Sequence, residues 1–319
     1  MKRLVVILLS GVASVNLSAA ENYPTRSIRF IAPFAAGGGT DLIARRLAQK
    51  LTESLGQTVV VDNRTGGSGV IGTELAAKAS PDGYTIMIAT PTLTVNPSLI
   101  KKLPYDAIRD FAAVSLVATS PHLLAVHPSV PAKSVKELVA VAKARRGELT
   151  FSSGSSGGSS HLSGELFKSV AGIRMIHVPY RGTGQAVVAM VSGEVSLGFN
   201  DVPTTLPHMK TGRLRGIAVT SLKRSAAVPE LPTIAESGYP GFQSGVWYGV
   251  LAPARTPAEI VGRLNSELVK IVLNPEFLHA IAAEGVEPVA SSPEYFAEFI
   301  KKETALWAKI IAKANINVN

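Results

Sequence analysis

Short apolar runs alternate with amphipathic stretches through most of the chain. The first runs predict strands at residues 28–32, 58–61, 84–89 and 114–118. Between the first two, every fourth position from Ile43 to Leu55 is apolar, which predicts one buried stripe on a helix over residues 40–55. Strands that alternate with helices form parallel sheets, so the pattern predicts an α/β fold.

Pro121 marks the point where we expect the chain to enter a second lobe. Strands are predicted there at residues 123–126, 149–152, 175–178, 195–199 and 214–220, and helices at about 134–146, 161–171, 183–192 and 203–211. A strand at 246–251 then returns the chain to the first lobe, where helices are predicted at about 256–273, 275–284 and 293–314. The expected lobes are 21–120 with 250–319, and 121–249. Two crossings between them place a cleft between the lobes.

The first twenty residues have the parts of a secretory signal peptide. The positive start Lys2-Arg3 precedes a short apolar run, and the small residues of Ser18-Ala19-Ala20 form a cleavage site. The run is shorter than the ~20 apolar residues that span a bilayer. The chain has no cysteine, which excludes both a lipid anchor at this site and disulfides. We therefore expect a cut near Ala20 and a soluble, periplasmic protein.

Composition narrows the function further. The chain has 319 residues, 46% hydrophobic and 17% charged, as expected for a well-packed globular protein. Its formal net charge of +9 favours anionic partners. Aromatic residues are only 6% and are not interleaved with the basic ones, so nucleic acid is not an expected partner. No histidine pair has metal-site spacing, and a periplasm offers little cofactor, so we expect neither a metal nor a cofactor.

Two loops of small residues, each between a predicted strand and a predicted helix, are the main candidates for a binding site. The first runs from Pro33 to Asp41, and the second, almost entirely serine and glycine, runs from Ser152 to His161. Ligands of open α/β sheets bind beyond the carboxyl ends of strands, where such loops lie. Glycine allows close approach to the backbone, and the following helix offers unpaired N–H groups to an anion. We expect both loops to bind one carboxylate.

Single residues elsewhere are weaker candidates. Asp201 follows a predicted strand and could meet a ligand ammonium or hydroxyl, or cap the next helix. Arg181 could face an anion or lie in solvent, and Thr90 ends the third strand. Trp247 and Tyr248 lie where the chain crosses between lobes, and we expect them to pack the hinge rather than stack on an aromatic ligand.

Two motif matches point to other functions. Residues 67–72 fit the dinucleotide fingerprint G-x-G-x-x-G, but they follow the second strand instead of the first, which argues against that function. The second loop fits the nucleophile elbow G-x-S-x-G around Ser156, and Asp201 with His208 or His279 would complete a triad. A loop of serine and glycine matches this motif easily by chance. An exported serine hydrolase is thus the alternative to a binding protein.

Several short blocks occur in a fixed order along the chain. They are Tyr23-Pro24, 31–41, 60–64, 80–84, 103–106, 159–162, 178–182 and 231–236. Each block alone is weak evidence for a protein family, but the order of all of them along the chain is specific to one family. From about Tyr23 to its end, the chain resembles the extracytoplasmic solute receptors of tripartite tricarboxylate transport systems, the Bug proteins.

This resemblance implies a two-lobed periplasmic-binding-protein (clamshell) fold, with two Rossmann-like lobes and the ligand in the cleft between them. It implies a monomeric, non-enzymatic receptor that delivers a small carboxylate to a membrane permease of one large and one small subunit. A sensor subunit that presents ligand to a membrane kinase would have the same site, so that alternative stays open. In the family, two loops hold one ligand carboxylate, partly through water.

The resemblance and the residue patterns together give one set of expected ligand-binding residues. These are Phe34, Gly37, Gly38, Gly39, Thr40, Asp41, Thr90, Ser156, Gly157, Gly158, Ser159, His161, Arg181 and Asp201. Many relatives carry a serine where this chain has Gly158, so we expect Ser156 or Ser159 to supply that hydroxyl.

Overall fold

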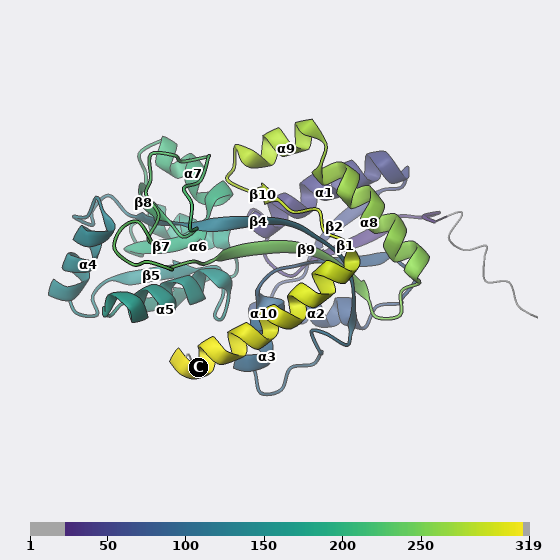
Figure 1. Ribbon diagram of the computed structural model, residues 1–319, viewed down its shortest axis with the longest axis horizontal. Helices are drawn as coiled ribbons and strands as arrows, with labels where there is room; N and C mark the ends of the chain where they lie inside the picture. The colour runs from purple at the N-terminus through teal and green to yellow at the C-terminus, as the bar shows by residue number, and fades with distance from the viewer. Residues whose placement is uncertain (1–22, 315–319) are drawn as a thin grey trace, which may run out of the picture.

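The computed structural model describes residues 23–314 (Figure 1). The predicted signal peptide, with its cut near Ala20, lies outside these residues. Within them, no helix is both long and apolar enough to cross a membrane.

The first sheet carries helices on both faces. Its strands lie in the order β2-β1-β3-β9-β4, and β1, β2 and β3 are parallel to one another. The strands are β1 (Ile28–Ala32), β2 (Val59–Asn63), β3 (Thr85–Ala89), β9 (Gly245–Pro253) and the first part of β4 (Phe111–Val126), with the short β10 (Glu287–Pro288) beside β4. One face packs on α1 (Gly39–Leu55), α8 (Ala258–Val272) and α9 (Pro275–Ala282). The other face packs on α2 (Val70–Ala77), which follows the 3₁₀ turn η1 (Gly67–Gly69), and on α3 (Thr92–Leu99) and α10 (Pro293–Ala314).

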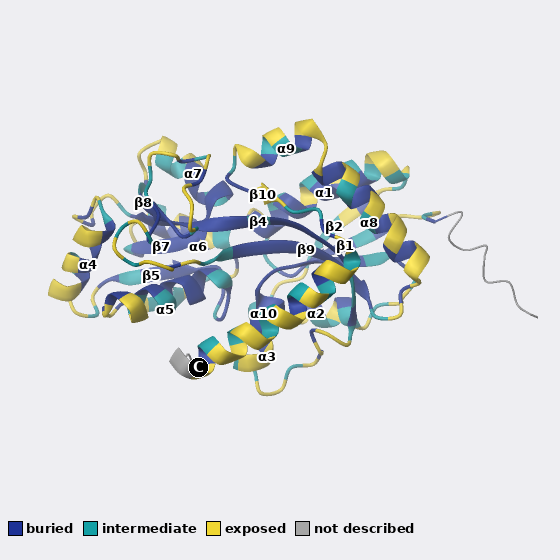
Figure 2. Cartoon of the chain, in the orientation of Figure 1, coloured by how far each residue is buried: buried dark blue, intermediate teal, exposed yellow. Residues whose placement is uncertain are grey.

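The second sheet is built in the same way from the middle of the chain. Its order is β4-β7-β5-β6, and β8 pairs with the other edge of β4. The new strands are β5 (Thr150–Ser153), β6 (Ile176–Pro179), β7 (Leu197–Asp201) and β8 (Arg215–Val219). The helices α4 (Val135–Ala144) and α5 (Ser159–Ala171) contribute to one core cluster, and α6 (Thr183–Val191) and α7 (Val202–Lys210) to two smaller ones. Buried strands at the centre and exposed outer helix faces are visible in Figure 2.

The first crossing is one long strand, where the sequence predicted two. Strand β4 continues through residues 114–126 without a break and belongs to both sheets. Pro121 does not interrupt it because it forms the last residue pair with β9, opposite Gly245. A missing N–H at the end of a ladder removes little pairing. Strands β4 and β9 are the chain's two crossings, and both pass through the predicted lobe boundaries.

Among the described residues, three elements were not predicted: the 3₁₀ turn η1, helix α3 and strand β10. Helix α3 begins with five consecutive buried residues, Thr92–Asn96, and contains Pro97, so it shows no amphipathic period. Strand β10 has two residues, which is too short for any pattern.

Helix α10 ties the lobes together on one side of the crossing strands. It packs on α3 and β4 (Figure 1). Near its end, Ile311 forms a buried cluster with Val95 of α3 and Leu162 of α5, so this helix of the first lobe reaches the second lobe.

Candidate ligand-binding cleft

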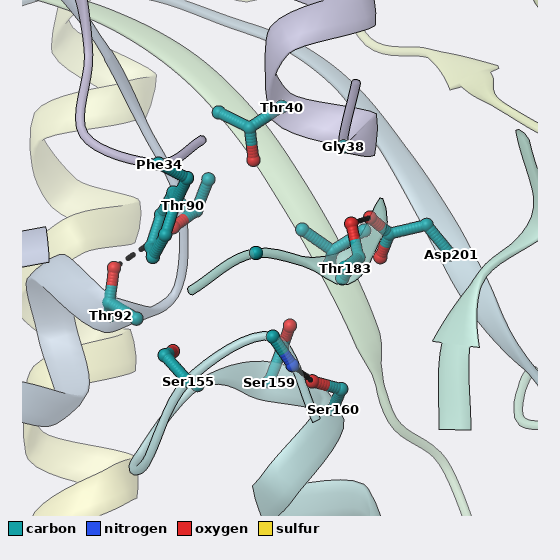
Figure 3. Close-up of a pocket in the computed structure, with 14 residues that line it drawn as sticks. Phe34, Gly38, Thr40, Thr90, Thr92, Ser155, Ser159, Ser160, Thr183 and Asp201 are labelled. Carbon is teal, nitrogen blue, oxygen red and sulfur yellow. Dashed lines mark hydrogen bonds between the residues drawn. The ribbon is translucent and has the colours of Figure 1, made fainter. Parts of the chain in front are cut away.

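A cavity with an empty volume of about 420 Å³ lies between the two lobes (Figure 3). Its lining comes from both. The lining residues are Phe34, Gly38, Thr40, Thr90, Thr92, Gly154, Ser155, Gly158, Ser159, Ser160, Gly182, Thr183, Asp201 and Val246. Among the described residues that line the cavity, Asp201 is the only charged one, and none is lysine or arginine.

Most of these residues stand at the starts of helices. Thr40 lies in the first turn of α1, Thr92 begins α3, Ser159 and Ser160 begin α5, Thr183 begins α6, and Asp201 is the N-cap of α7. The first N–H groups of a helix have no partner within it, and the helix dipole adds a partial positive charge there. Several helix N-termini that meet at one cavity can bind an anion without a basic side chain.

Asp41 holds the first loop in place from outside the cavity. Its carboxylate accepts hydrogen bonds from the Gly37 N–H at 2.9 Å, from Asn63 Nδ2 at 2.9 Å and from Arg45 Nε at 2.9 Å. Burial alone would raise the pKa of Asp41, but the hydrogen bonds from Arg45, Gly37 and Asn63 outweigh it and lower the pKa. Asp41 is therefore an ionised support for the loop, and Gly37 supplies it with an N–H.

Gly39 lies where the two lobes touch. Its N–H donates to Thr183 Oγ1 at 3.2 Å, and Thr183 Oγ1 donates to Asp201 Oδ2 at 3.1 Å. A Cβ atom on Gly39 would overlap the Asp201 carboxylate and would lie 2.9 Å from the Tyr248 hydroxyl. Only glycine lets α1 approach the second lobe this closely, and its N–H serves the contact between lobes instead of pointing to a free ligand position.

Arg181 also joins the lobes, through its backbone. Its carbonyl accepts a hydrogen bond from the Ala35 N–H at 3.3 Å, while its side chain is exposed. Arg181 and Ser156 line a neighbouring groove outside the cavity. No hydrogen bond joins Ser156 to a histidine in the described structure, so the geometry of a nucleophile elbow with its base is not formed there.

His161 stabilises the second loop by a hydrogen bond to its backbone. Its Nδ1 accepts the N–H of Gly157 at 3.0 Å, which places the ring proton on Nε2, 3.6 Å from a Glu165 carboxylate oxygen. The ring stacks on His177, with centroids 3.7 Å apart, and His177 Nε2 lies 2.6 Å from Ser153 Oγ. Burial lowers the pKa of His177 to about 3, so this ring is neutral. The stacked pair fixes the loop whose Gly158 and Ser159 line the cavity.

Asp201 is a buried carboxyl group without a cationic partner. It is 3% exposed, and burial raises its pKa to about 6. His122 Nε2 lies 3.6 Å from Oδ1, but burial lowers the pKa of His122 to about 3, so the imidazole is neutral. Burial also raises the pKa of Tyr248, whose hydroxyl has no hydrogen-bond partner in the described structure. Asp201 can therefore accept a hydrogen bond from a ligand.

The structure brings half of the predicted residues to the cavity. Phe34, Gly38, Thr40, Thr90, Gly158, Ser159 and Asp201 line it. Gly37, Gly39, Asp41, Ser156, Gly157, His161 and Arg181 do not, and most of these hold the loops or join the lobes. Sequence reasoning missed Thr92, Gly154, Ser155, Ser160, Gly182, Thr183 and Val246. A rule that takes every serine or threonine at a helix start after a strand would have found Thr183 and Ser160.

Known proteins resemble the chain over nearly its whole length. Residues 43–316 match the family described as tripartite tricarboxylate transporter family receptor. Protein BugT of Bordetella pertussis is 38% identical over 316 residues, which cover 98% of this chain and 97% of BugT. A protein of Pseudomonas sp. strain P51, described by its place in the tcbD-tcbE intergenic region, is 38% identical and covers 98% of this chain and 94% of its own length.

Solved structures confirm the predicted α/β periplasmic-binding-protein fold. R. palustris Rpa4515 with adipate superposes with a TM-score of 0.90 at 37% identity, covering 92% of this chain and 99% of that one. Periplasmic binding protein BugD gives 0.89 at 34% identity, with 92% and 99% covered. MatC from Rhodopseudomonas palustris with bound malate gives 0.86 at 28% identity, with 91% and 100% covered.

Proposed function

Because this chain belongs to the tripartite tricarboxylate transporter family of receptors, we propose that it captures a small carboxylate and delivers it to the two-subunit membrane permease of such a system. The family consists of periplasmic solute-binding proteins and not of enzymes. The hydrolase alternative on Ser156 is therefore excluded. A sensor subunit would use the same cleft, and only its partner would differ.

The observation that carries the proposal is a cavity surrounded by helix N-termini and hydroxyl groups. Each helix end is worth about 0.3–1 kcal/mol to an anion, and up to ~2 kcal/mol when partly buried. Thr40 at the start of α1 and Ser159 and Ser160 at the start of α5 face one space from opposite lobes. One carboxylate between these two helices would be held by backbone N–H groups and hydroxyls, and would draw the lobes together.

Asp201 is proposed to select among carboxylates. It lines the same cavity and repels a second negative charge, whereas a ligand hydroxyl or ammonium can donate to it. Two of the solved relatives hold a carboxylate, adipate in Rpa4515 and malate in MatC. We propose a ligand of similar size that carries a carboxylate at the helix ends and a hydrogen-bond donor toward Asp201.

The remaining expectations also stand as proposals. The exported protein begins after Ala20, acts as a monomer, and consists of lobe 1 (21–120 and 250–319) and lobe 2 (121–249). It needs neither a metal nor a cofactor to bind its solute.

A thermal-shift screen of the purified periplasmic protein against small carboxylates tests the proposed function. The panel contains adipate, malate, amino acids and aromatic acids, each beside its uncharged amide. A specific ligand stabilises the folded protein by about 2.7 kcal/mol at a hundredfold excess over its Kd, so the melting temperature rises with concentration. Equal shifts with acid and amide, or no shift with any acid, would contradict a carboxylate receptor. Uptake of the identified acid by cells lacking the chain then tests delivery.

A further inference from the structure

A second hollow lies on the α10 side of the crossing strands. It is a groove with an empty volume of about 1300 Å³, bounded by α5, α10 and parts of β4 and β9. The chain has two tryptophans, Trp247 on β9 and Trp307 on α10, and both line this groove. The proposed carboxylate function makes no use of it.

The charge in this groove is acidic, in a chain whose net charge is +9. Among the described residues that line it, Glu287 and Glu303 are the only charged ones. Glu303 Oε2 accepts a hydrogen bond from Trp307 Nε1 at 3.0 Å, and no lysine or arginine of the described residues forms an ion pair with Glu303. Glu303 is thus a fixed carboxylate that lacks a cation.

The indole of Trp247 is buried next to Glu303. Trp247 is only 4% exposed, and its Nε1 lies near the Glu303 carboxylate without forming a hydrogen bond of good geometry in the described structure. Burial raises the pKa of Glu303, although the indole N–H groups of Trp307 and Trp247 oppose that rise. Glu303 is thus a half-buried carboxylate beside two neutral indoles, and a ligand cation placed there would offset its charge.

Apart from the two carboxylates, the lining is mixed: uncharged polar residues lie on the side of the crossing strands, and apolar side chains come from helices of both lobes. Leu166 of α5 and Leu306 and Ile310 of α10 line the groove, and Leu306 is 48% exposed. Leu162 of α5 is buried and packs against α10 there. Phe299 and Trp307 offer aromatic surface beside Glu303. Aromatic faces next to a carboxylate attract organic cations, and apolar walls bind an alkyl chain.

We propose that this groove is a second binding site, for a small organic cation with an apolar body, such as a protonated alkylamine. The ammonium group lies at Glu303, and the alkyl chain lies along the leucine and isoleucine side chains. Because α5 and α10 belong to different lobes, such a ligand contacts both of them at once.

Intrinsic fluorescence tests this site directly, because both tryptophans of the chain line it. The full exported protein is titrated with n-hexylammonium and with n-hexanol, which share the alkyl chain and differ in charge. We expect a saturable change in emission with hexylammonium and at least ~tenfold weaker binding of hexanol, the ratio that about 1.4 kcal/mol gives. Glu303→Gln is expected to bring hexylammonium down to the affinity of hexanol. Glu298→Gln, on the same helix but outside the groove, is expected to change neither.

Equal affinity for hexylammonium and hexanol would overturn the proposal, as would unchanged hexylammonium binding in Glu303→Gln. A measurement on the unaltered protein covers the case in which that variant does not fold. Added salt should weaken hexylammonium binding and leave hexanol binding unchanged. Salt-independent binding of both probes would show an apolar groove without a cation site.

Discussion

At the scale of single residues, burial and hydrogen-bond donors together decide the charge of the carboxyl groups in and around the cleft. Asp41 is surrounded by donors and stays ionised, whereas Asp201 receives a hydrogen bond from one hydroxyl and faces two neutral rings. The same carboxyl group thus supports a loop in one place and, in the proposed function, accepts a hydrogen bond from the ligand in another. The difference comes from neighbours and not from residue type.

Asp201 should make the stability of the protein depend on pH. Its pKa is raised from 3.8 to about 6 in the folded state, so the folded protein binds this proton more tightly than the unfolded chain. Stability from this group is therefore fully present below about pH 4 and is lost as the pH rises through about 6. Asp201→Asn, which does not titrate, should gain stability relative to the wild type across this window, by of order 1–3 kcal/mol.

Urea unfolding of both proteins at about four pH values from 4 to 7 checks this expectation. The difference in free energy of unfolding should grow with pH and level off above about pH 6. A difference that is constant or that shrinks with rising pH would show that Asp201 is not the titrating group.

The site residues divide into those that sequence could predict and those that it could not. Gly38, Thr40 and Ser159 were found because two strand–loop–helix units carry their own signal. Thr183 was missed, although its place at a helix start could have marked it as a candidate. Its hydrogen bond with Gly39 could not be predicted, because the two residues lie 144 positions apart and no local pattern links them. The roles of Asp41 and His161 could not be predicted either. In the sequence, a residue that hydrogen-bonds the backbone of a loop occupies the same kind of position as one that contacts a ligand.

At the scale of elements, strand β9 and helix α10 form one packing unit. Phe296 of α10 is fully buried and meets Trp247 of β9 edge to face, with ring centroids 5.7 Å apart. Gly249 on the same strand leaves room for it, since a Cβ there would overlap the Phe296 ring. Small and large side chains thus interlock across this contact.

Replacing Phe296 with alanine should cost about 3–5 kcal/mol of stability, because a large ring leaves a cavity in a tightly packed core. Tyr295→Ala is the matched control on the same helix, because Tyr295 is 57% exposed, and it should cost less than about 0.5 kcal/mol. Denaturant unfolding of both variants measures the two costs. Similar costs for both would show that α10 is not anchored through this ring.

The predicted elements succeeded where the apolar period was regular. The strand and helix of residues 28–55 have clean periods, and the structure places them within one residue of the expected ends. Two strands were predicted in place of β4, because both a proline and a change of sheet resemble the end of a strand in the local sequence. Whether a strand ends or changes partners depends on other strands, which the local sequence does not contain.

At the scale of the whole molecule, hydrogen bonds between residues of the chain hold the two lobes together. Thr183 links them by accepting the Gly39 N–H and donating to Asp201. Valine has nearly the shape of threonine but no hydroxyl, so Thr183→Val should favour the open form by about 1 kcal/mol. Ligand affinity should then fall about fivefold, because a smaller fraction of the molecules adopts the closed, binding-competent form.

Two measurements distinguish this loss of closure from the loss of a direct ligand contact. Calorimetry with the acid from the thermal screen gives the affinity, and small-angle X-ray scattering gives the radius of gyration without ligand. Thr183→Val should show a larger ligand-free radius than the wild type, and Thr211→Val, exposed in the same lobe, should not. A weakened affinity with an unchanged radius would mean that Thr183 only touches the ligand.

The position of β9 in the first sheet also sets the order in which the two lobes can be completed during synthesis. In the first sheet, β9 lies between β3 and β4, so β3 keeps a free edge until residues 245–253 have been made. Every strand of the second sheet comes earlier in the chain. The second sheet can therefore form completely while the first sheet still lacks β9. An unpaired buried strand is a template for wrong partners, so the half-made chain is at greatest risk of aggregation in its first lobe.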